Sequence, residues 1–224
     1  MKPARNVVFA GASCGRNKSA VEAALTEKEI AICLQRAYRE GGPVFWDGMN
    51  GMTPPEVMTC AAVLIPFVWV EEAWHLVFTR RTDTVEHHKG QVSFPGGGCE
   101  VHEGSPEETA LREACEEIGL KPEDVRLLGR MNEMATITRY RVTPVIGSMP
   151  WPYPLHLAEK EVDRVFTIPL AWLADPKNRE ERPFTPGGES RPVPVVIYRQ
   201  YDGETLWGVS GRIVLNLLKI LDLA

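Results

Sequence analysis

The chain has 224 residues, a formal net charge of −5 and a hydrophobic share of 44%. This length suits one domain with a sizeable core. The negative charge argues against a protein that coats nucleic acid or an anionic membrane, since both tasks usually need a basic surplus. The longest apolar run, residues 61–70, contains a proline and is too short for a membrane-spanning helix. We therefore expect a globular protein that has neither nucleic acid nor a membrane as its partner.

The cysteines and the N-terminus bear on the cellular compartment. The five cysteines form no CxxC pair, so we expect neither a disulfide framework nor a structural zinc site, and a cytoplasmic location fits best. Residues 1–25 faintly resemble a lipoprotein signal before Cys14, but their apolar stretch is shorter than a signal core requires. We interpret residues 1–25 as a loosely ordered N-terminal segment and residues 26–224 as the folded domain.

Helix and hairpin signals come first along the domain. Thr26 and Glu29 form a capping box ahead of a helix over residues 27–40, which a Gly-Gly pair ends. Two strands within residues 61–81 are expected to form a hairpin around a Glu-Glu-Ala turn. The helix positions placed on its inner face are Ile30, Cys33, Leu34, Ala37 and Tyr38.

A glycine-rich loop over residues 94–105 precedes the second helix. Ser105 is the expected N-cap, and Pro106 the first residue of a helix that runs to Ile118 and ends at Gly119. The elements expected after it are strands near 125–131, 141–147 and 163–168, a short helix around Trp172, a hairpin of 195–201 with 204–208, and a final helix at about 210–222. This interleaving predicts a mixed α/β or α+β domain.

The acidic residues are concentrated in one segment. Residues 100–117 hold seven acids and one base, a net charge of −6. Three of the acids, Glu113, Glu116 and Glu117, are spaced i, i+3 and i+4, so they share one helix face. Such charges repel unless a cation lies among them, and carboxylate oxygens suit hard cations such as Mg²⁺ or Mn²⁺. A solvated acidic face is the alternative.

The segment 94–120 resembles the Nudix box, commonly written G-x5-E-x7-R-E-U-x-E-E-x-G-U, with U an aliphatic residue. Residues 112–120 match the helical half without a gap, with a small alanine at one aliphatic position. Gly97 and Glu103 match the first half. Eight residues, where the motif has seven, then separate Glu103 from the arginine of the helical half. We interpret Gly104 as an inserted loop residue that leaves the helical acids in register.

The resemblance implies a Nudix-type α/β/α sandwich, with a mixed sheet between helices. It also implies a pyrophosphohydrolase whose carboxylates hold Mg²⁺ or Mn²⁺, which polarises the phosphoryl oxygens of a nucleoside diphosphate derivative. By this resemblance the metal ligands are Glu113, Glu116, Glu117 and the carbonyl of Gly96 or Gly97. Arg112 is expected to pair with Glu103 or Glu116 and to orient the acids. Glu161 is the candidate for a more distant acid, with a solvated loop residue as the alternative.

A second block, residues 76–97, is similar to the signature of the coenzyme A pyrophosphatase branch, roughly L-L-T-x-R-[SA]-x3-R-x3-G-x3-F-P-G-G. The chain departs from it at Thr82 and, with a reversed charge, at Glu86, where arginine is usual. Residues 141–145 and 206–208 also look like that branch. The candidate substrate-binding residues are Arg80, Arg81, Gln91 and Gly97, and the first three are alternatively surface residues at a strand end.

This similarity implies hydrolysis of coenzyme A or acyl-CoA to 3′,5′-ADP and 4′-phosphopantetheine. The alternatives are another nucleoside diphosphate derivative (ADP-ribose, NADH or a nucleoside triphosphate) and a Nudix domain that senses a nucleotide without cutting it. We expect His87 and His88 to have surface or packing roles, and Trp151 to cover a loop or to stack on adenine. The acyl preference is open, and so is assembly as a homodimer.

Overall fold

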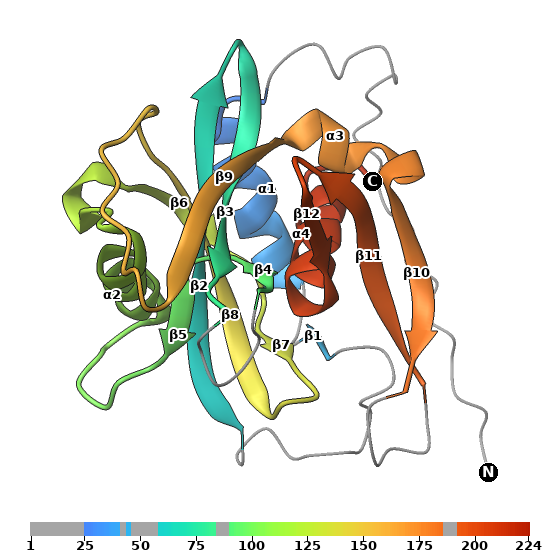
Figure 1. Ribbon diagram of the computed structural model, residues 1–224, viewed down its shortest axis with the longest axis horizontal. Coiled ribbons are helices and arrows are strands. Elements are labelled where there is room, and N and C mark those ends of the chain that lie inside the picture. Colours follow the sequence, from blue (N-terminus) through green and yellow to red (C-terminus); the bar gives the residue numbers. More distant parts are fainter. Residues whose placement is uncertain (1–24, 41–43, 46–57, 84–89, 186–191) are drawn as a thin grey trace.

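Figure 1 shows the computed structural model of the chain, which describes residues 25–40, 44–45, 58–83, 90–185 and 192–224. The N-terminal segment predicted at residues 1–25 lies outside this part of the chain except for Leu25, and so do Glu86, His87 and His88. Within the described ranges, no helix is long and apolar enough to cross a bilayer.

Nine strands form one large mixed sheet. Their bounds are β1 Val44–Phe45, β2 Thr59–Val70, β3 Ala73–Arg81, β4 Val92–Ser93, β5 Gly96–Gly98, β6 Arg126–Arg130, β7 Met134–Ala135, β8 Tyr140–Ser148 and β9 Val162–Pro169. The main path runs β1-β7-β8-β2-β3-β4, while β5 pairs with β2, β6 with β8 and β9 with β3. Strands β2 and β8 run parallel, and β2 and β3 form the predicted antiparallel hairpin.

Helices cover both faces of this sheet, which confirms the predicted fold class. Their bounds are α1 Glu27–Glu40, α2 Pro106–Ile118, α3 Leu170–Ala174 and α4 Gly208–Ile220, with short 3₁₀ turns at Pro122–Asp124 and Pro176–Asn178. Alternate side chains of β2 serve the two cores: Leu64 and Val68 pack with α2, whereas Ile65 and Phe67 pack with α1 and α4. Because both faces are buried, β2 is apolar at nearly every position. In Figure 1, α2 lies to the left of the sheet and α1 and α4 to the right.

A second, three-stranded antiparallel sheet packs on α4. It consists of β10 Arg179–Phe184, β11 Val193–Tyr201 and β12 Glu204–Trp207. The β11–β12 hairpin around Asp202 and Gly203 was predicted, and both turn residues have the positive φ that such turns need. Strand β10 was not predicted, because its sequence REERPF is charged, exposed and without alternation. The prediction therefore missed the separate sheet.

The first helix begins as its sequence signal predicts, whereas the Gly-Gly pair expected to end it lies outside the described residues. The capping box of α1 is formed: Thr26 N donates to Glu29 Oε2 at 2.9 Å, and Glu29 N donates to Thr26 Oγ1 at 3.2 Å. The inward placement of Tyr38 is wrong, because its ring is 42% exposed and lies under the Arg130 guanidinium. Helix α4 begins at Gly208, two residues earlier than predicted.

One disulfide corrects the expectation from the cysteines. Cys60, near the start of β2, is bonded to Cys99, just after β5. Nothing in their sequence separation of 39 residues indicates a bond. Antiparallel pairing of β2 with β5 brings their Cα atoms to within 5.4 Å of each other. Of the other cysteines, Cys33 and Cys115 are described and are free.

Candidate active site

Helix α2 is fixed at both ends, and this positions its acids. Ser105 Oγ accepts from Glu108 N at 3.3 Å as the N-cap, and Pro106 is the first helical residue, as predicted. Gly119 ends the helix in the left-handed conformation, with φ of 69°. Gly104 lies in the loop ahead of the cap, so the extra residue leaves the helical residues in register.

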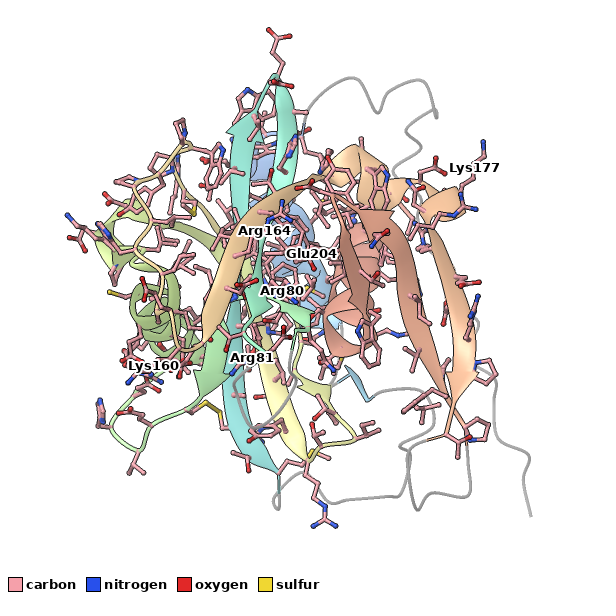
Figure 2. The ribbon with its side chains drawn as sticks, in the orientation of Figure 1. Arg80, Arg81, Lys160, Arg164, Lys177 and Glu204 are labelled. Atoms are coloured by element: carbon pink, nitrogen blue, oxygen red, sulfur yellow. A yellow bond between two sulfur atoms is a disulfide. The ribbon has the colours of Figure 1, made fainter. Side chains whose placement is uncertain are left out.

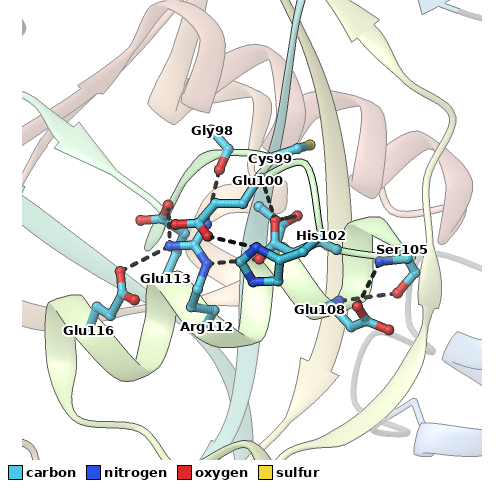
Figure 3. Close-up of polar contacts among 12 residues, drawn as sticks. Gly98, Cys99, Glu100, His102, Ser105, Glu108, Arg112, Glu113 and Glu116 are labelled. Atoms are coloured by element: carbon cyan, nitrogen blue, oxygen red, sulfur yellow. Dashed lines mark hydrogen bonds and ion pairs between the residues drawn. The ribbon is translucent and has the colours of Figure 1, made fainter.

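Arg112 ties the glycine-rich loop to the helix, as Figure 3 shows. Its Nε donates to Glu103 Oε1 at 2.8 Å, and its Nη2 donates to the carbonyl of Gly98 at 3.0 Å. Its Nη1 forms ion pairs with Glu113 Oε1 at 2.9 Å and Glu116 Oε2 at 3.0 Å. One guanidinium thus holds three acids and one backbone carbonyl, a planar arrangement that lysine cannot reproduce.

Glu103 is fixed inside the loop. Its carboxylate accepts from the side chains of Arg112 and Thr109 and from the backbone N–H of Glu100. Burial acts to raise its pKa, but these three hydrogen bonds outweigh burial and lower the pKa to about 2. The carboxylate is therefore ionised and fully engaged, an arrangement suited to shaping the loop.

Glu113 and Glu117 are in the opposite situation, because for them the effect of burial on the pKa outweighs the effect of their partners. Glu117 is 4% exposed, and burial raises its pKa to about 8, against the lowering effect of Arg81 and with a further rise from Glu113. Gly96 N donates to Glu117 Oε2 at 3.3 Å. Burial also raises the pKa of Glu113, against its pairing with Arg112. Two poorly solvated carboxylates thus repel each other beside the loop.

Two glycines permit this close approach. A Cβ atom on Gly97 would lie 2.4 Å from the Glu113 carboxylate, and one on Gly96 would lie 2.5 Å from the carbonyl oxygen of Ala62. No side chain fits either space, so the backbone of β5 lies directly against Glu113 at Gly97 and against β2 at Gly96. The structure therefore brings Gly96 and Gly97 to the same place as Glu113 and Glu117.

The two remaining candidate acids, Glu116 and Glu161, are exposed. The Glu116 side chain is 60% exposed and pairs with Arg112. Glu161 is exposed in the turn just before β9, but its charge also helps to raise the pKa of Glu113 and Glu117, which places it in their neighbourhood. Among the residues that the structure describes, no three histidine, cysteine or acidic side chains form a ready metal-binding group.

The donors nonetheless fit a hard divalent cation. All are oxygen atoms, the preferred ligands of Mg²⁺ and Mn²⁺, and the ionised form of Glu117 would have only a partial counter-charge in Arg81. Glu113 and Glu116 are held by Arg112 in this structure. Arg112 pairs with Oε1 of Glu113 and Oε2 of Glu116, so the other oxygen of each carboxylate can bind a cation while Arg112 holds the side chain.

The neighbouring residues Arg80 and Arg81 point to opposite sides of β3, as alternation along a strand requires. Arg81 Nη1 lies 3.5 Å from Glu117 Oε1. Arg80 forms ion pairs with Asp83, with Asp163 of β9 and with Glu204 of β12. Figure 2 shows Arg80 beside Glu204. The structure thus gives Arg81 a place in the site and Arg80 a place in an ion-pair network.

A cavity of about 390 Å³ adjoins the acids at Arg81 and Gly96. Gln91 lines it, whereas Trp151 packs in the core on the α2 side of the sheet. Sequence reasoning missed the three aromatic residues that line the cavity and are partly exposed, Tyr140, Phe184 and Trp207. They come from three distant strands, so no local sequence pattern could have grouped them.

Comparison with known proteins places the site in a family. Residues 58–187 match the family model described as NUDIX domain. The protein named "Uncharacterized Nudix hydrolase NudL" from Escherichia fergusonii is 36% identical over 157 residues, which cover 70% of this chain and 80% of that protein. A protein of the same name from Cronobacter sakazakii is 43% identical over 111 residues, covering 50% of this chain and 57% of that protein.

Solved structures give partial matches. RenU, a Nudix hydrolase from M. smegmatis, has a TM-score of 0.45 and 24% identity, covering 53% of this chain and 74% of that one. A C. elegans Ap4A hydrolase in a binary complex has a TM-score of 0.43 and 15% identity, covering 49% of this chain and 80% of that one.

Proposed function

Because this chain belongs to the Nudix family, we propose that it hydrolyses the diphosphate of coenzyme A or acyl-CoA, releasing 3′,5′-ADP and 4′-phosphopantetheine or its acyl form. Family membership makes it a hydrolase of phosphoric anhydrides that acts on nucleoside diphosphate derivatives. The narrower choice of coenzyme A rests on the residues that resemble the coenzyme A branch, above all Arg81.

The observation that carries this proposal is the buried carboxyl group of Glu117 beside Gly96, whose ionised form Arg81 compensates only in part. Mg²⁺ or Mn²⁺ at Glu113, Glu116, Glu117 and the carbonyl of Gly96 would favour that ionised form by neutralising its charge. When bound, the ion supplies polarisation of the phosphoryl oxygens. Glu161 completes the proposed set of acids on the side of β9.

The chain's own residues do the rest by placement and charge. Arg81 can exchange part of its contact with Glu117 for a phosphoryl oxygen, a charge-assisted hydrogen bond of the stronger kind. Arg112 and Glu103 hold the loop so that the backbone of Gly97 stays against Glu113. Positioning of this kind provides much of the rate in phosphoryl transfer.

A broader nucleoside diphosphate hydrolase is the second candidate, and Glu86 favours it. That residue has a negative charge where the coenzyme A signature has arginine. ADP-ribose, NADH and nucleoside triphosphates are then the substrates to compare. A sensor that binds a nucleotide without cutting it has no evident need for three helical acids.

A substrate panel with product identification tests the proposal. The full chain is incubated with Mg²⁺ or Mn²⁺ and with coenzyme A, acetyl-CoA, ADP-ribose, NADH or ATP, and products are identified by mass spectrometry. We expect coenzyme A and acetyl-CoA to be cut with the highest kcat/KM. Equal or higher kcat/KM on ADP-ribose or NADH would contradict the coenzyme A assignment, and binding without any product would indicate a sensor.

A further inference from the structure

The cavity beside Arg81 lies between the two sheets. On one side it is lined by Val63, Val92 and Val142 of the large sheet, and on the other by Val195 of β11 and Val209 of α4. The three aromatic residues Tyr140, Phe184 and Trp207 also line it and are 42%, 44% and 38% exposed, so they form its mouth. The cavity is therefore an apolar space that adjoins the acids at one end and opens past aromatic rings.

Charge is nearly absent from this lining. Among the described residues that line the cavity, Arg81 is the one charged side chain, and it already contacts Glu117. Several lining hydroxyls are paired inside the protein: Ser93 Oγ lies 3.0 Å from Thr79 Oγ1, and the side chains of Thr136 and Thr138 are 3.0 Å apart. A phosphate buried here would have no dedicated cation, and burying an unpaired charge is strongly unfavourable.

We infer that this cavity binds the uncharged arm of the substrate, which in coenzyme A is pantetheine with any acyl group on its sulfur. The inference rests on the proposed function. A diphosphate held at Arg81 and Gly96 would send one substituent between the sheets. The 3′-phosphorylated nucleoside carries additional negative charge, so it stays outside in water.

The competing occupant is the nucleoside itself. Gly208 and Ser210, at the N-terminus of α4, also line the cavity, and helix N-termini favour anions. Trp207 offers a face on which adenine could stack. The apolar side chains on both walls favour the arm, and the two occupants make different predictions for the separate halves of coenzyme A.

Binding of those halves to the metal-free protein distinguishes the two occupants. Calorimetry would measure the Kd of 3′,5′-ADP and of S-acetyl, S-butanoyl and S-hexanoyl pantetheine, which are uncharged. We expect the pantetheine series to bind more tightly with chain length, by up to about fourfold per methylene if each is buried. Val195→Trp should fill the cavity and weaken S-hexanoyl pantetheine at least about tenfold while leaving 3′,5′-ADP unchanged.

Two further variants keep the comparison matched. Val209→Phe narrows the same cavity from the side of α4. It replaces Val195→Trp if a thermal melt shows that Val195→Trp does not fold. Ile32→Trp adds the same ring at a position of α1 that is 55% exposed, and should change neither Kd. Chain-length dependence in the unmodified protein is a test that needs no variant.

The inference is overturned if affinity does not depend on chain length, or if filling the cavity weakens 3′,5′-ADP and spares S-hexanoyl pantetheine. That second result would assign the cavity to the nucleoside. Failure of the proposed function looks different: with Mg²⁺ the protein would leave coenzyme A intact, whatever the pantetheine series shows. Cleavage of coenzyme A without chain-length dependence would remove the cavity assignment alone.

Discussion

At the scale of single residues, Glu117 combines burial, a like-charged neighbour and one partial counter-charge. Its pKa in the folded protein, about 8, lies above its ordinary value of 4.5. A raised carboxyl pKa stabilises the folded state while the group is protonated, below the unfolded pKa, and that contribution is lost as pH rises through about 8. The acid that we propose as a metal ligand thus destabilises the metal-free protein at neutral and alkaline pH.

We predict that, without metal, Glu117→Gln is more stable than the parent chain. The difference in the free energy of unfolding should grow as pH rises from about 5 to about 8.5. The gain should reach a few kcal/mol, since one pKa unit corresponds to about 1.4 kcal/mol. Urea unfolding in the presence of a chelator, at several pH values, measures the difference. A constant difference across this range would show that Glu117 does not titrate as its burial requires, and Mg²⁺ should reduce the gain by stabilising only the parent chain.

Gly97 and Gly98 make a matched pair for testing the close approach of loop and helix. A Cβ atom on Gly97 would overlap the Glu113 carboxylate at 2.4 Å, whereas one on Gly98 would meet only the Cys60 carbonyl oxygen, at 4.0 Å. Gly97→Ala should therefore lower kcat/KM by about 10²-fold, the scale of a misplaced catalytic group, and Gly98→Ala by little. Equal effects of the two substitutions on kcat/KM would mean that the contact with Glu113 does not matter.

Much of the candidate site can be predicted from the sequence, because the spacing of the Nudix box places Glu113, Glu116 and Glu117 on one helix face. The resemblance to the coenzyme A branch favours Arg81 over Arg80 but gives no physical reason for that choice, since the reason depends on which side of β3 faces the acids. The pairing of β9 and β12 with Arg80, through Asp163 and Glu204, is a tertiary contact that no local pattern shows.

At the scale of elements, Arg112 is the link between the glycine-rich loop and α2. We predict that Arg112→Lys raises the Mg²⁺ concentration for half-maximal activity by about tenfold to a hundredfold, the range found for residues that orient metal ligands. Lysine keeps the charge but cannot reach Glu103, Gly98 and two further acids together. The measurement is a Mg²⁺ titration of coenzyme A cleavage.

Arg130→Lys is the control for this prediction. Arg130 is also an arginine paired with an acid of α2, Glu107, at 3.4 Å, but neither residue is among the candidate site residues. Its replacement should leave the Mg²⁺ titration unchanged. An unchanged titration for Arg112→Lys as well would show that the link is dispensable.

Element boundaries were predictable where local chemistry fixes them. The capping box of α1, the Ser105 and Gly119 caps of α2 and the Asp202–Gly203 turn are all formed. Strand β10 was not predictable, since its charged residues form a strand only by pairing with β11.

At the scale of the whole molecule, the Cys60–Cys99 disulfide joins β2 to the glycine-rich loop across 39 residues. We also propose that the protein is cytoplasmic and that residues 26–224 form its folded domain. Disulfides seldom persist in the cytoplasm. In an oxidising buffer, Cys99→Ser should lower the free energy of unfolding by about 2–4 kcal/mol, because a cross-link of this length restricts the unfolded chain. A reductant should have the same effect on the parent chain, and Cys115→Ser, at an exposed free thiol, should have none. Equal stability of the parent chain with and without reductant would mean that the bond contributes nothing.

Metal dependence of turnover tests the central claim most directly. The release of 3′,5′-ADP from coenzyme A is followed for the parent chain with Mg²⁺, after excess chelator, after Mg²⁺ is restored, and for Glu117→Gln. We predict release by the parent chain with Mg²⁺, loss with chelator, recovery on restoration, and a rate at least about 10²-fold lower for Glu117→Gln, the scale on which single electrostatic groups act. Turnover that persists in excess chelator, or that Glu117→Gln retains at the parent rate, would contradict a metal site at these acids.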